Sequence, residues 1–293
     1  MSLRLEMLQV ARLGPDVLGP DAAGRVEDFV RSQQNPDGGF CDRDGRSDLY
    51  YTSFAVDTLT ALQREIPATL AGFLGGQEPA RLDFVHAACL VRLLSAVRDQ
   101  APRDRIESAL ARLEDFRSSD GGYNQSPGAS SGSSYACFLA YGAYADHGLI
   151  PPLPEGVARC LQSLAQPSGG WANDSMFPVA NVPSTAAAVA VARNLRLPIP
   201  LETADFILGA FHPETGGFLP FPGAPLPDLL STAVALHALD GLQADLSVVK
   251  EPCLDFIDTL WTADGGFHGN WDDDALDLEY TYYGLLALGH LSL

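Results

Sequence analysis

Basic residues are scarce in this chain of 293 residues. Lysine and arginine together number 18, against 37 aspartate and glutamate residues, and the formal net charge is −19. The only lysine is Lys250, and residues 151–293 carry four basic residues beside 17 acidic ones. Because contacts with phosphate need a basic surface, this composition excludes nucleic-acid binding.

Long apolar runs are also missing. No stretch of about 18 uninterrupted apolar residues occurs, so the sequence predicts no membrane span. Residues 1–20 lack a basic start followed by an apolar run, which predicts no secretion signal. The five cysteines are odd in number and widely spaced, as is typical of reduced thiols, and we therefore expect a cytoplasmic protein.

What the chain does have is a repeated phrase of two glycines and an aromatic residue. The copies are Gly38-Gly39-Phe40, Gly121-Gly122-Tyr123, Gly169-Gly170-Trp171, Gly216-Gly217-Phe218 and Gly265-Gly266-Phe267. The last four are 48, 47 and 49 residues apart, a period that indicates one supersecondary unit copied several times. The first gap, of 83 residues, contains Gly75-Gly76-Gln77, which we interpret as a degenerate sixth copy.

The segments on the two sides of each phrase differ in character. Those before it are amphipathic, with apolar residues at helical spacing, and predict outer helices over 24–34, 103–117, 155–166, 201–211 and 248–261. Those after it are nearly uncharged and rich in small residues, which predicts buried inner helices over 49–62, 84–97, 133–145, 183–195, 229–239 and 280–291. Each repeat is therefore an outer helix, a glycine turn and an inner helix.

The chemistry of the turns agrees with this pattern. Glycine adopts the left-handed conformation that ends a helix, and the aromatic residue after it can pack back on its own repeat. An aspartate precedes four of the inner helices, at Asp48, Asp83, Asp228 and Asp277. Since a carboxylate accepts hydrogen bonds from the free N–H groups at a helix start, we expect these residues to be N-caps.

Six helical hairpins predict an all-α fold, the (α/α)6 toroid, with an inner and an outer ring of helices. With 46% hydrophobic residues, residues 1–293 are expected to form a single domain of six repeats of about 48 residues. An open solenoid is the structural alternative, although its repeats are usually shorter.

These repeats resemble the α/α-toroid superfamily, which includes protein prenyltransferase β subunits and squalene-hopene-type terpene cyclases. Two stretches look closest to the β subunit of Rab geranylgeranyltransferase: Gly216 to Ser231, and Asp277 to Gly284. The resemblance implies a toroid scaffold over nearly the whole chain, whereas the repeat alone says little about function.

The resemblance also shows where this chain departs from protein prenyltransferases. Their catalytic zinc is held by an Asp-x-Cys motif and a histidine, and the matching positions are Asp228, Leu230 and Tyr280. Because two of the three ligand types are replaced, no zinc is expected there. The basic residues that grip the diphosphate match Pro222 and Pro225, and an upstream histidine of the pocket matches Asn181.

The cyclase branch offers a different motif, Asp-x-Asp-Asp-Thr, whose middle aspartate protonates an alkene. In this sequence the same register contains Asp277, Glu279 and Thr281, with Tyr280 in place of the last aspartate. The resemblance therefore implies Asp277 and Glu279, with Asp228, as candidate catalytic residues. Burial and the neighbouring carboxylate would keep one of the two acids protonated.

Two further metal sites are conceivable. Asp272, Asp273 and Asp274, with Asp277 and Glu279, could hold Mg²⁺ or Ca²⁺ through carboxylate oxygens, or they could form a solvated acidic loop. In a closed ring the first and last repeats are neighbours, so Cys41 and His268 could form a displaced zinc site.

The starts of the inner helices are expected to line the mouth of a cavity. An aromatic-rich pocket with a few polar groups suits an isoprenoid or a carbocation made from one. The candidate ligand-binding residues are Tyr50, Tyr51, Asp83, His86, Tyr135, Asn181, Ser184, Ser231 and Tyr280.

Two functions from different classes remain open. The first is a prenyltransferase-like or terpene-cyclase-like protein that binds an isoprenoid or other apolar small molecule in a central cavity. The second is a non-catalytic toroid that serves as an interaction subunit for a helical protein partner. Leu70, Phe73 and Leu74 are the candidate contact residues for that partner.

Overall fold

The computed structural model describes residues 2–97 and 102–293, which are mostly helical. The chain divides into two compact units. The terminal unit contains Glu6–Gly72 and Ile207–Leu293, and the middle unit contains Phe73–Phe206 with the residues up to Leu5. Three helices have residues in both units: α1 (Leu3–Ala11), α5 (Leu70–Gly76) and α11 (Thr203–Leu208). That the chain is a single domain stays a prediction.

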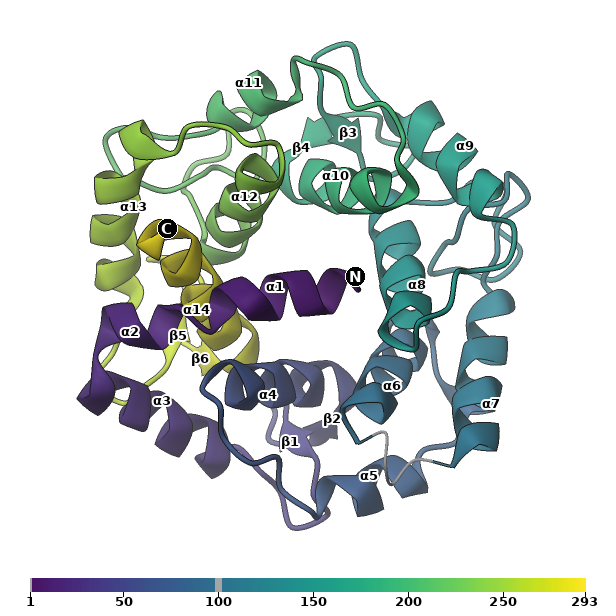
Figure 1. Cartoon of the computed structure of the whole chain (residues 1–293), viewed down its shortest axis with the longest axis horizontal. Coiled ribbons are helices and arrows are strands. Elements are labelled where there is room, and N and C mark those ends of the chain that lie inside the picture. Colours follow the sequence, from purple (N-terminus) through teal and green to yellow (C-terminus); the bar gives the residue numbers. More distant parts are fainter. Residues whose placement is uncertain (1, 98–101) are drawn as a thin grey trace. The chain divides into compact units, whose positions relative to one another are not determined.

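The terminal unit joins the first repeat to the last two. Its inner helices are α4 (Leu49–Ala61), α12 (Leu229–Gly241) and α14 (Leu278–Ser292), and α14 packs against both others (Figure 1). Helices α2 (Gly14–Leu18), α3 (Pro20–Ser32) and α13 (Ser247–Leu260) pack around them. Two short antiparallel pairs complete the unit: β1 (Phe40–Cys41) with β2 (Ser47–Asp48), and β5 (Phe267–His268) with β6 (Leu276–Asp277).

The middle unit repeats the same plan. Its inner helices are α6 (Phe84–Ala96), α8 (Ser134–Asp146) and α10 (Val182–Leu195), with α8 in contact with both others. The outer helices are α7 (Arg103–Glu114) and α9 (Pro154–Leu164), and a 3-10 turn, η1 (Pro79–Arg81), precedes α6. One antiparallel pair, β3 (Trp171–Ala172) with β4 (Ala180–Asn181), leads into α10.

All six inner helices begin with a side-chain N-cap. The four aspartates predicted from the sequence accept hydrogen bonds from the backbone N–H three residues later, at 2.6–3.0 Å, which confirms that prediction. Asn181 caps α10 and Ser133 caps α8 in the same way. Each cap thus satisfies one of the free N–H groups at the start of its inner helix.

The glycine turns have the predicted conformation in five repeats. The first glycine of each phrase has φ between 82° and 94°, and the aromatic residue that follows is buried, as for Phe40 and Phe218 at 0% exposure. The second repeat differs, because Gly75 and Gly76 lie at the end of α5 without a left-handed φ. The degenerate copy therefore keeps its helices and has lost the turn.

The first and last repeats pack directly together. A Cβ atom at Gly265 would collide with the carbonyl of Arg25 in α3, and Arg25 Nη1 donates to the carbonyl of Ala263 at 2.8 Å. Helices α4 and α14 are also in contact. An open solenoid keeps its terminal repeats apart, so this contact is evidence against that alternative.

Within residues 2–97 and 102–293, no helix combines the length and the apolar character needed to cross a bilayer.

Candidate functional site

The candidate site begins where β6 turns into α14. In the β5–β6 pair, Phe267 lies opposite Asp277, and the connecting loop carries the acidic residues 272–274. Asp277 is 5% exposed, and its Oδ1 accepts the N–H of Tyr280 at 2.9 Å. The cap of α14 is thus a buried carboxylate at the centre of the acidic segment.

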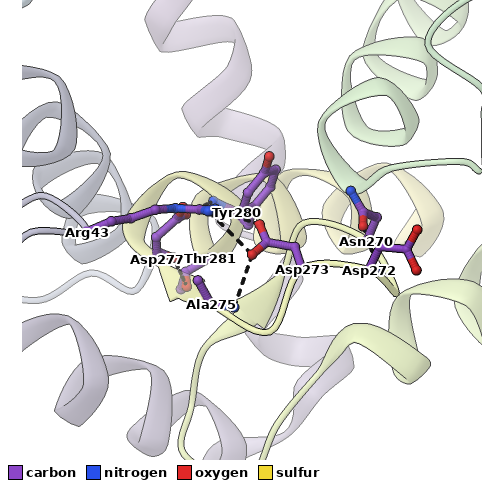
Figure 2. Close-up of polar contacts among 8 residues, drawn as sticks. All are labelled: Arg43, Asn270, Asp272, Asp273, Ala275, Asp277, Tyr280 and Thr281. Carbon is purple, nitrogen blue, oxygen red and sulfur yellow. Dashed lines mark hydrogen bonds and ion pairs between the residues drawn. The ribbon is translucent and has the colours of Figure 1, made fainter.

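Arg43 joins this segment from the loop between β1 and β2. Its Nε donates to Asp277 Oδ2 at 2.9 Å, and its Nη2 forms an ion pair with the same oxygen at 2.7 Å. Its Nη1 and Nη2 also donate to the two carboxylate oxygens of Asp273, at 3.3 and 2.7 Å (Figure 2). The guanidinium lies 5.7 Å from the centre of the Tyr280 ring. One arginine of the first repeat therefore holds two carboxylates of the last.

Burial and Arg43 oppose each other at these carboxylates. For Asp277, burial raises the pKa above its ordinary value, against the hydrogen bonds from Tyr280 and Arg43. For Asp273, burial acts in the same direction, but the hydrogen bonds from Arg43 and the Ala275 N–H outweigh it and lower the pKa. The same two carboxylates raise the pKa of Arg43 despite its partial burial.

Glu279 lies in the first turn of α14, and its carboxyl accepts a 2.7 Å hydrogen bond from the Tyr50 hydroxyl of α4. Burial raises the pKa of Glu279 to about 7, and the nearby carboxylates of Asp277 and Asp228 add to the rise. Tyr50 and Arg43 act in the opposite direction. A carboxyl group with this pKa is half protonated near neutral pH, which suits a general acid.

Asp228 is the equivalent cap on the neighbouring inner helix, α12. Its two carboxylate oxygens accept hydrogen bonds from the N–H and the hydroxyl of Ser231, at 2.6 and 2.9 Å. Burial raises the pKa of Asp228 despite these bonds. Asp228 is thus a second partly desolvated carboxyl group close enough to affect Glu279.

Aromatic rings surround these acids within the terminal unit. The Tyr50 ring packs edge-on against Tyr51 and Phe54, with centroids 5.7 and 4.9 Å apart. The Tyr280 ring lies against Gly269, where any Cβ atom would collide with it. Burial raises the pKa values of Tyr51 and Tyr280, so both phenols stay neutral and their faces remain suited to apolar or cationic groups.

The structure places the other candidate ligand residues in the middle unit, each at the start of an inner helix. Asp83 accepts from the His86 N–H and lies 2.8 Å from its Nδ1. Asn181 accepts from the Ser184 N–H at 2.8 Å. The N–H of Tyr135 donates to Asn173 Oδ1 at 3.3 Å.

The structure does not gather the candidate metal ligands. Asp273 is engaged by Arg43, and Cys41 donates its thiol hydrogen to Gln33 Oε1 at 3.2 Å. In the part of the chain that the structure describes, no three histidine, cysteine, aspartate or glutamate side chains form a group able to hold a metal ion. Neither the magnesium site at 272–274 nor the displaced zinc site at Cys41 and His268 gains support.

The residues at the zinc positions of the prenyltransferase family do not fit zinc either. The carboxylate of Asp228 is engaged by Ser231, Leu230 has no donor atom, and the Tyr280 phenol stays protonated because burial raises its pKa. Zinc needs thiolate, imidazole or carboxylate ligands, so these three positions provide one ligand at most.

Sequence reasoning missed Arg43 and considered Asp273 only as a possible magnesium ligand, so it did not predict that these two residues form a pair. The signal that could have found them is the adjacency of the first and last repeats, which had already suggested Cys41 and His268. Arg43 is the nearest basic residue to follow Cys41, and residues 207–293 contain no basic residue except Lys250. A charge that compensates the acidic segment therefore had to come from another repeat.

Comparison with protein families identifies one match. The family described as the prenyltransferase alpha-alpha toroid domain matches residues 22–80 and 200–292, just over half of the chain. No curated protein matches the sequence significantly.

Several solved structures are similar over nearly the whole chain. A variant of the type II terpene cyclase MstE from Scytonema, in complex with geranylgeranyl dihydroxybenzoate, is 12% identical with a TM-score of 0.61, and 97% of each chain is covered. A protein from Actinoplanes is 17% identical with a TM-score of 0.63, covering 93% of this chain and 99% of that one. An inactive α-1,6-mannanase variant from Salegentibacter, in complex with α-1,6-mannotetrose, is 12% identical with a TM-score of 0.61, covering 93% and 98%.

These matches confirm the all-α toroid fold class predicted from the repeats. At identities of 12–17% they show the fold alone.

Proposed function

The chain belongs to the prenyltransferase alpha-alpha toroid domain family, and on that premise we propose that it binds an isoprenoid-like apolar molecule at its inner helices and protonates it with Glu279. The observation that carries the proposal is the environment of Glu279, a half-buried carboxyl group with a pKa of about 7 that accepts a hydrogen bond from Tyr50. The terpene cyclase neighbour, which is in complex with an isoprenoid compound, supports the ligand class.

The proposed step is an acid-catalysed addition. The carboxyl O–H of Glu279 breaks and its proton forms a C–H bond at an alkene carbon, which leaves a carbocation on the substrate and a carboxylate on the enzyme. The tyrosine faces and the carboxylates of Asp228 and Asp277 stabilise that cation. A second alkene of the same molecule closes the ring, and loss of a proton from the product cation restores the charge balance.

This proposal differs from prenyl transfer to a protein thiol. That reaction needs a zinc-bound thiolate and a basic grip on a diphosphate, and the matching positions hold Leu230, Tyr280, Pro222 and Pro225. Acid catalysis by a neutral carboxyl group needs neither.

The direct test is incubation of the purified protein in D2O with uncharged polyprenoids such as geranylgeraniol and its terminal epoxide. We expect geranylgeraniol to give isomeric products that carry one carbon-bound deuterium. The epoxide, which is protonated on oxygen, should give isomeric cyclic alcohols without it, and gas chromatography with mass spectrometry detects both kinds of product. Glu279→Gln should reduce turnover at least ~100-fold, because an amide cannot replace the general acid. Glu251→Gln, at an exposed position of α13 in the same unit, is the matched control and should keep wild-type turnover.

Unchanged turnover in Glu279→Gln would remove Glu279 as the acid. Binding and cleavage of α-1,6-mannosides in the same assay, without any polyprenoid product, would overturn the ligand class.

The non-catalytic alternative finds no support at the residues expected to carry it. Leu70, Phe73 and Leu74 are 0%, 8% and 1% exposed, so they pack within the protein and do not offer a contact surface to a partner.

A further inference from the structure

The charge balance of the candidate site depends on one side chain from the other end of the chain. Residues 207–293 contain 13 acidic residues and one basic residue, Lys250. Arg43, from the loop between β1 and β2, contacts both Asp277 and Asp273 at 2.7 Å through the same Nη2. In Figure 2 its side chain reaches across to the start of α14 and lies beside Tyr280.

Two carboxyl groups two residues apart compete for a proton at this helix start. Asp277 and Glu279 are both at least partly buried, and the charge of Asp277 helps to raise the pKa of Glu279. Like charges brought together in a desolvated site cannot both remain ionised at low cost, so such a pair tends to retain one proton. The question for catalysis is which of the two carries it.

The groups that face this pair come from five segments, one of which is the β5–β6 loop, whose Asp273 adds negative charge beside Asp277. Tyr50 of α4 donates to Glu279, the N–H of Tyr280 in α14 donates to Asp277, and Asp228 at the start of α12 adds negative charge beside Glu279. Arg43 is the only cation that the structure places in direct contact with either carboxylate, among the residues it describes, and it contacts Asp277.

We propose that Arg43 is a positioning residue that assigns the shared proton to Glu279, by holding Asp277 ionised and fixed at the helix start. An ion pair favours the charged form of the acid it contacts. The geometry therefore makes Asp277 the carboxylate and leaves the proton on Glu279, whose neutral form accepts the Tyr50 hydrogen bond through its carbonyl oxygen. The catalytic meaning of this assignment rests on the function proposed above, whereas the assignment itself does not.

The bridge also explains why the site spans both ends of the chain. Asp277 and Asp273 meet Arg43 only because the first and last repeats pack together within the terminal unit. The acid is thus correctly protonated only in the assembled protein.

The test uses carboxyl ¹³C NMR titration of the full-length protein, with Asp277→Asn and Glu279→Gln to assign the two signals. In the wild type, Glu279 should titrate near pH 7 and Asp277 should remain ionised well below it. In Arg43→Met the titration of Asp277 should move upward by about 1–3 pH units, with the proton shared between the two carboxyls. Arg43→Lys, which keeps the charge, should move it less.

Arg64→Met is the matched control, because Arg64 also pairs with a carboxylate of the terminal unit, that of Glu27 at 2.6 Å. It should leave both titrations unchanged. If Arg43→Met does not fold, Asp273→Asn provides the second measurement: Arg43 then has only Asp277 to bind, so Asp277 should stay ionised and the Glu279 proton should remain in place.

An Asp277 titration that is the same in folded Arg43→Met as in the wild type, or that moves equally in Arg64→Met, would overturn the assignment. Protonation of Asp277 in Asp273→Asn at neutral pH would overturn it as well. Absence of polyprenoid turnover alongside the expected NMR shifts would instead reject the proposed function and leave the role of Arg43 standing.

Discussion

At Glu279, burial and neighbouring charge act in the same direction. Desolvation penalises the carboxylate, and Asp277 and Asp228 repel it, so its pKa rises from 4.5 to about 7. The Tyr50 hydrogen bond at 2.7 Å satisfies the group without reversing the shift. A glutamate in the first turn of a helix thereby becomes an acid that is about half protonated at neutral pH.

This shift predicts a pH dependence of stability. Because the folded pKa exceeds the unfolded one, the contribution of Glu279 to stability is complete below about pH 4.5 and is lost as the pH rises to about 7. The loss is up to ~3 kcal/mol for a shift of about 2.5 units. We expect Glu279→Gln to be more stable relative to the wild type at pH 8 than at pH 4.5, as measured by urea unfolding at each pH.

Glu251→Gln is the matched control, since Glu251 is exposed on α13, and its stability relative to the wild type should not change over this pH range. A constant difference between Glu279→Gln and the wild type would show that Glu279 titrates at its ordinary pKa in the folded protein.

At the scale of elements, the inner helices α12 and α14 pack against each other. Their starts carry the caps and the candidate site, and the far ends of α12 and α14 are joined by a histidine pair. His237 Nδ1 lies 3.0 Å from His290 Nε2, and Asp240 lies 3.5 Å from the other ring nitrogen of His290. Burial lowers the pKa of His290 to about 4, so His290 enters the pair as a neutral imidazole.

His290 should therefore make the packing of α12 and α14 sensitive to acid. Its folded pKa lies below the ordinary 6.5, so its contribution to stability is complete above about pH 6.5 and is lost as the pH falls to about 4. The sign is opposite to that of Glu279, and the two contributions nearly cancel between pH 4.5 and 6.5. We expect His290→Gln, although less stable at neutral pH, to lose up to ~3 kcal/mol less than the wild type between pH 6.5 and 4, by urea unfolding.

If the free energy of unfolding falls equally in His290→Gln and the wild type between pH 6.5 and 4, His290 is protonated without cost in the folded protein. In the double variant His290→Gln with Glu279→Gln, the effects on the pH dependence of the free energy of unfolding should add, since the two residues lie at opposite ends of α14.

At the scale of the whole molecule, the contact between the first and last repeats is the feature that assembles the site. Gly265 has φ of 92°, and a Cβ atom there would strike the carbonyl of Arg25 in α3. The turn of the last repeat thus lies so close to the first outer helix that only glycine fits. The same contact brings the Arg43 loop toward Asp273 and Asp277.

Comparison of Gly265→Ala with a control variant should separate the cost of the collision from the cost of backbone strain. The matched control is Gly45→Ala, because Gly45 has φ of 80° with nothing within 4 Å of a Cβ atom. We expect Gly45→Ala to cost ~1–2 kcal/mol for the left-handed backbone alone, and Gly265→Ala to cost ~1–3 kcal/mol more because of the collision. Urea unfolding of both variants measures the difference.

Equal costs in the two variants would mean that the first and last repeats do not pack closely at this turn in solution. The Arg43 bridge would then lack its structural support, and the carboxyl titrations of Gly265→Ala should match those of the wild type.

Much of the fold follows from the sequence because its determinants are local. A period of 47–49 residues, glycine at a left-handed turn and aspartate three residues before a free N–H each act over a few residues. These signals predicted the hairpins, the caps and the toroid class. They did not predict the loss of the turn at Gly75, which depends on how α5 ends.

The site was predicted only in part. The resemblance to cyclases indicated Asp277 and Glu279 as candidates, and the structure places both at the start of α14 beside Tyr50 and Asp228, but their roles remain proposals. Arg43 and Asp273 are 230 residues apart, and Arg43 and Asp277 are 234 apart. Only tertiary structure decided these pairs, because the sequence encodes the repeat unit, whereas the packing of the first repeat on the last determines which charges meet and how deeply Glu279 is buried.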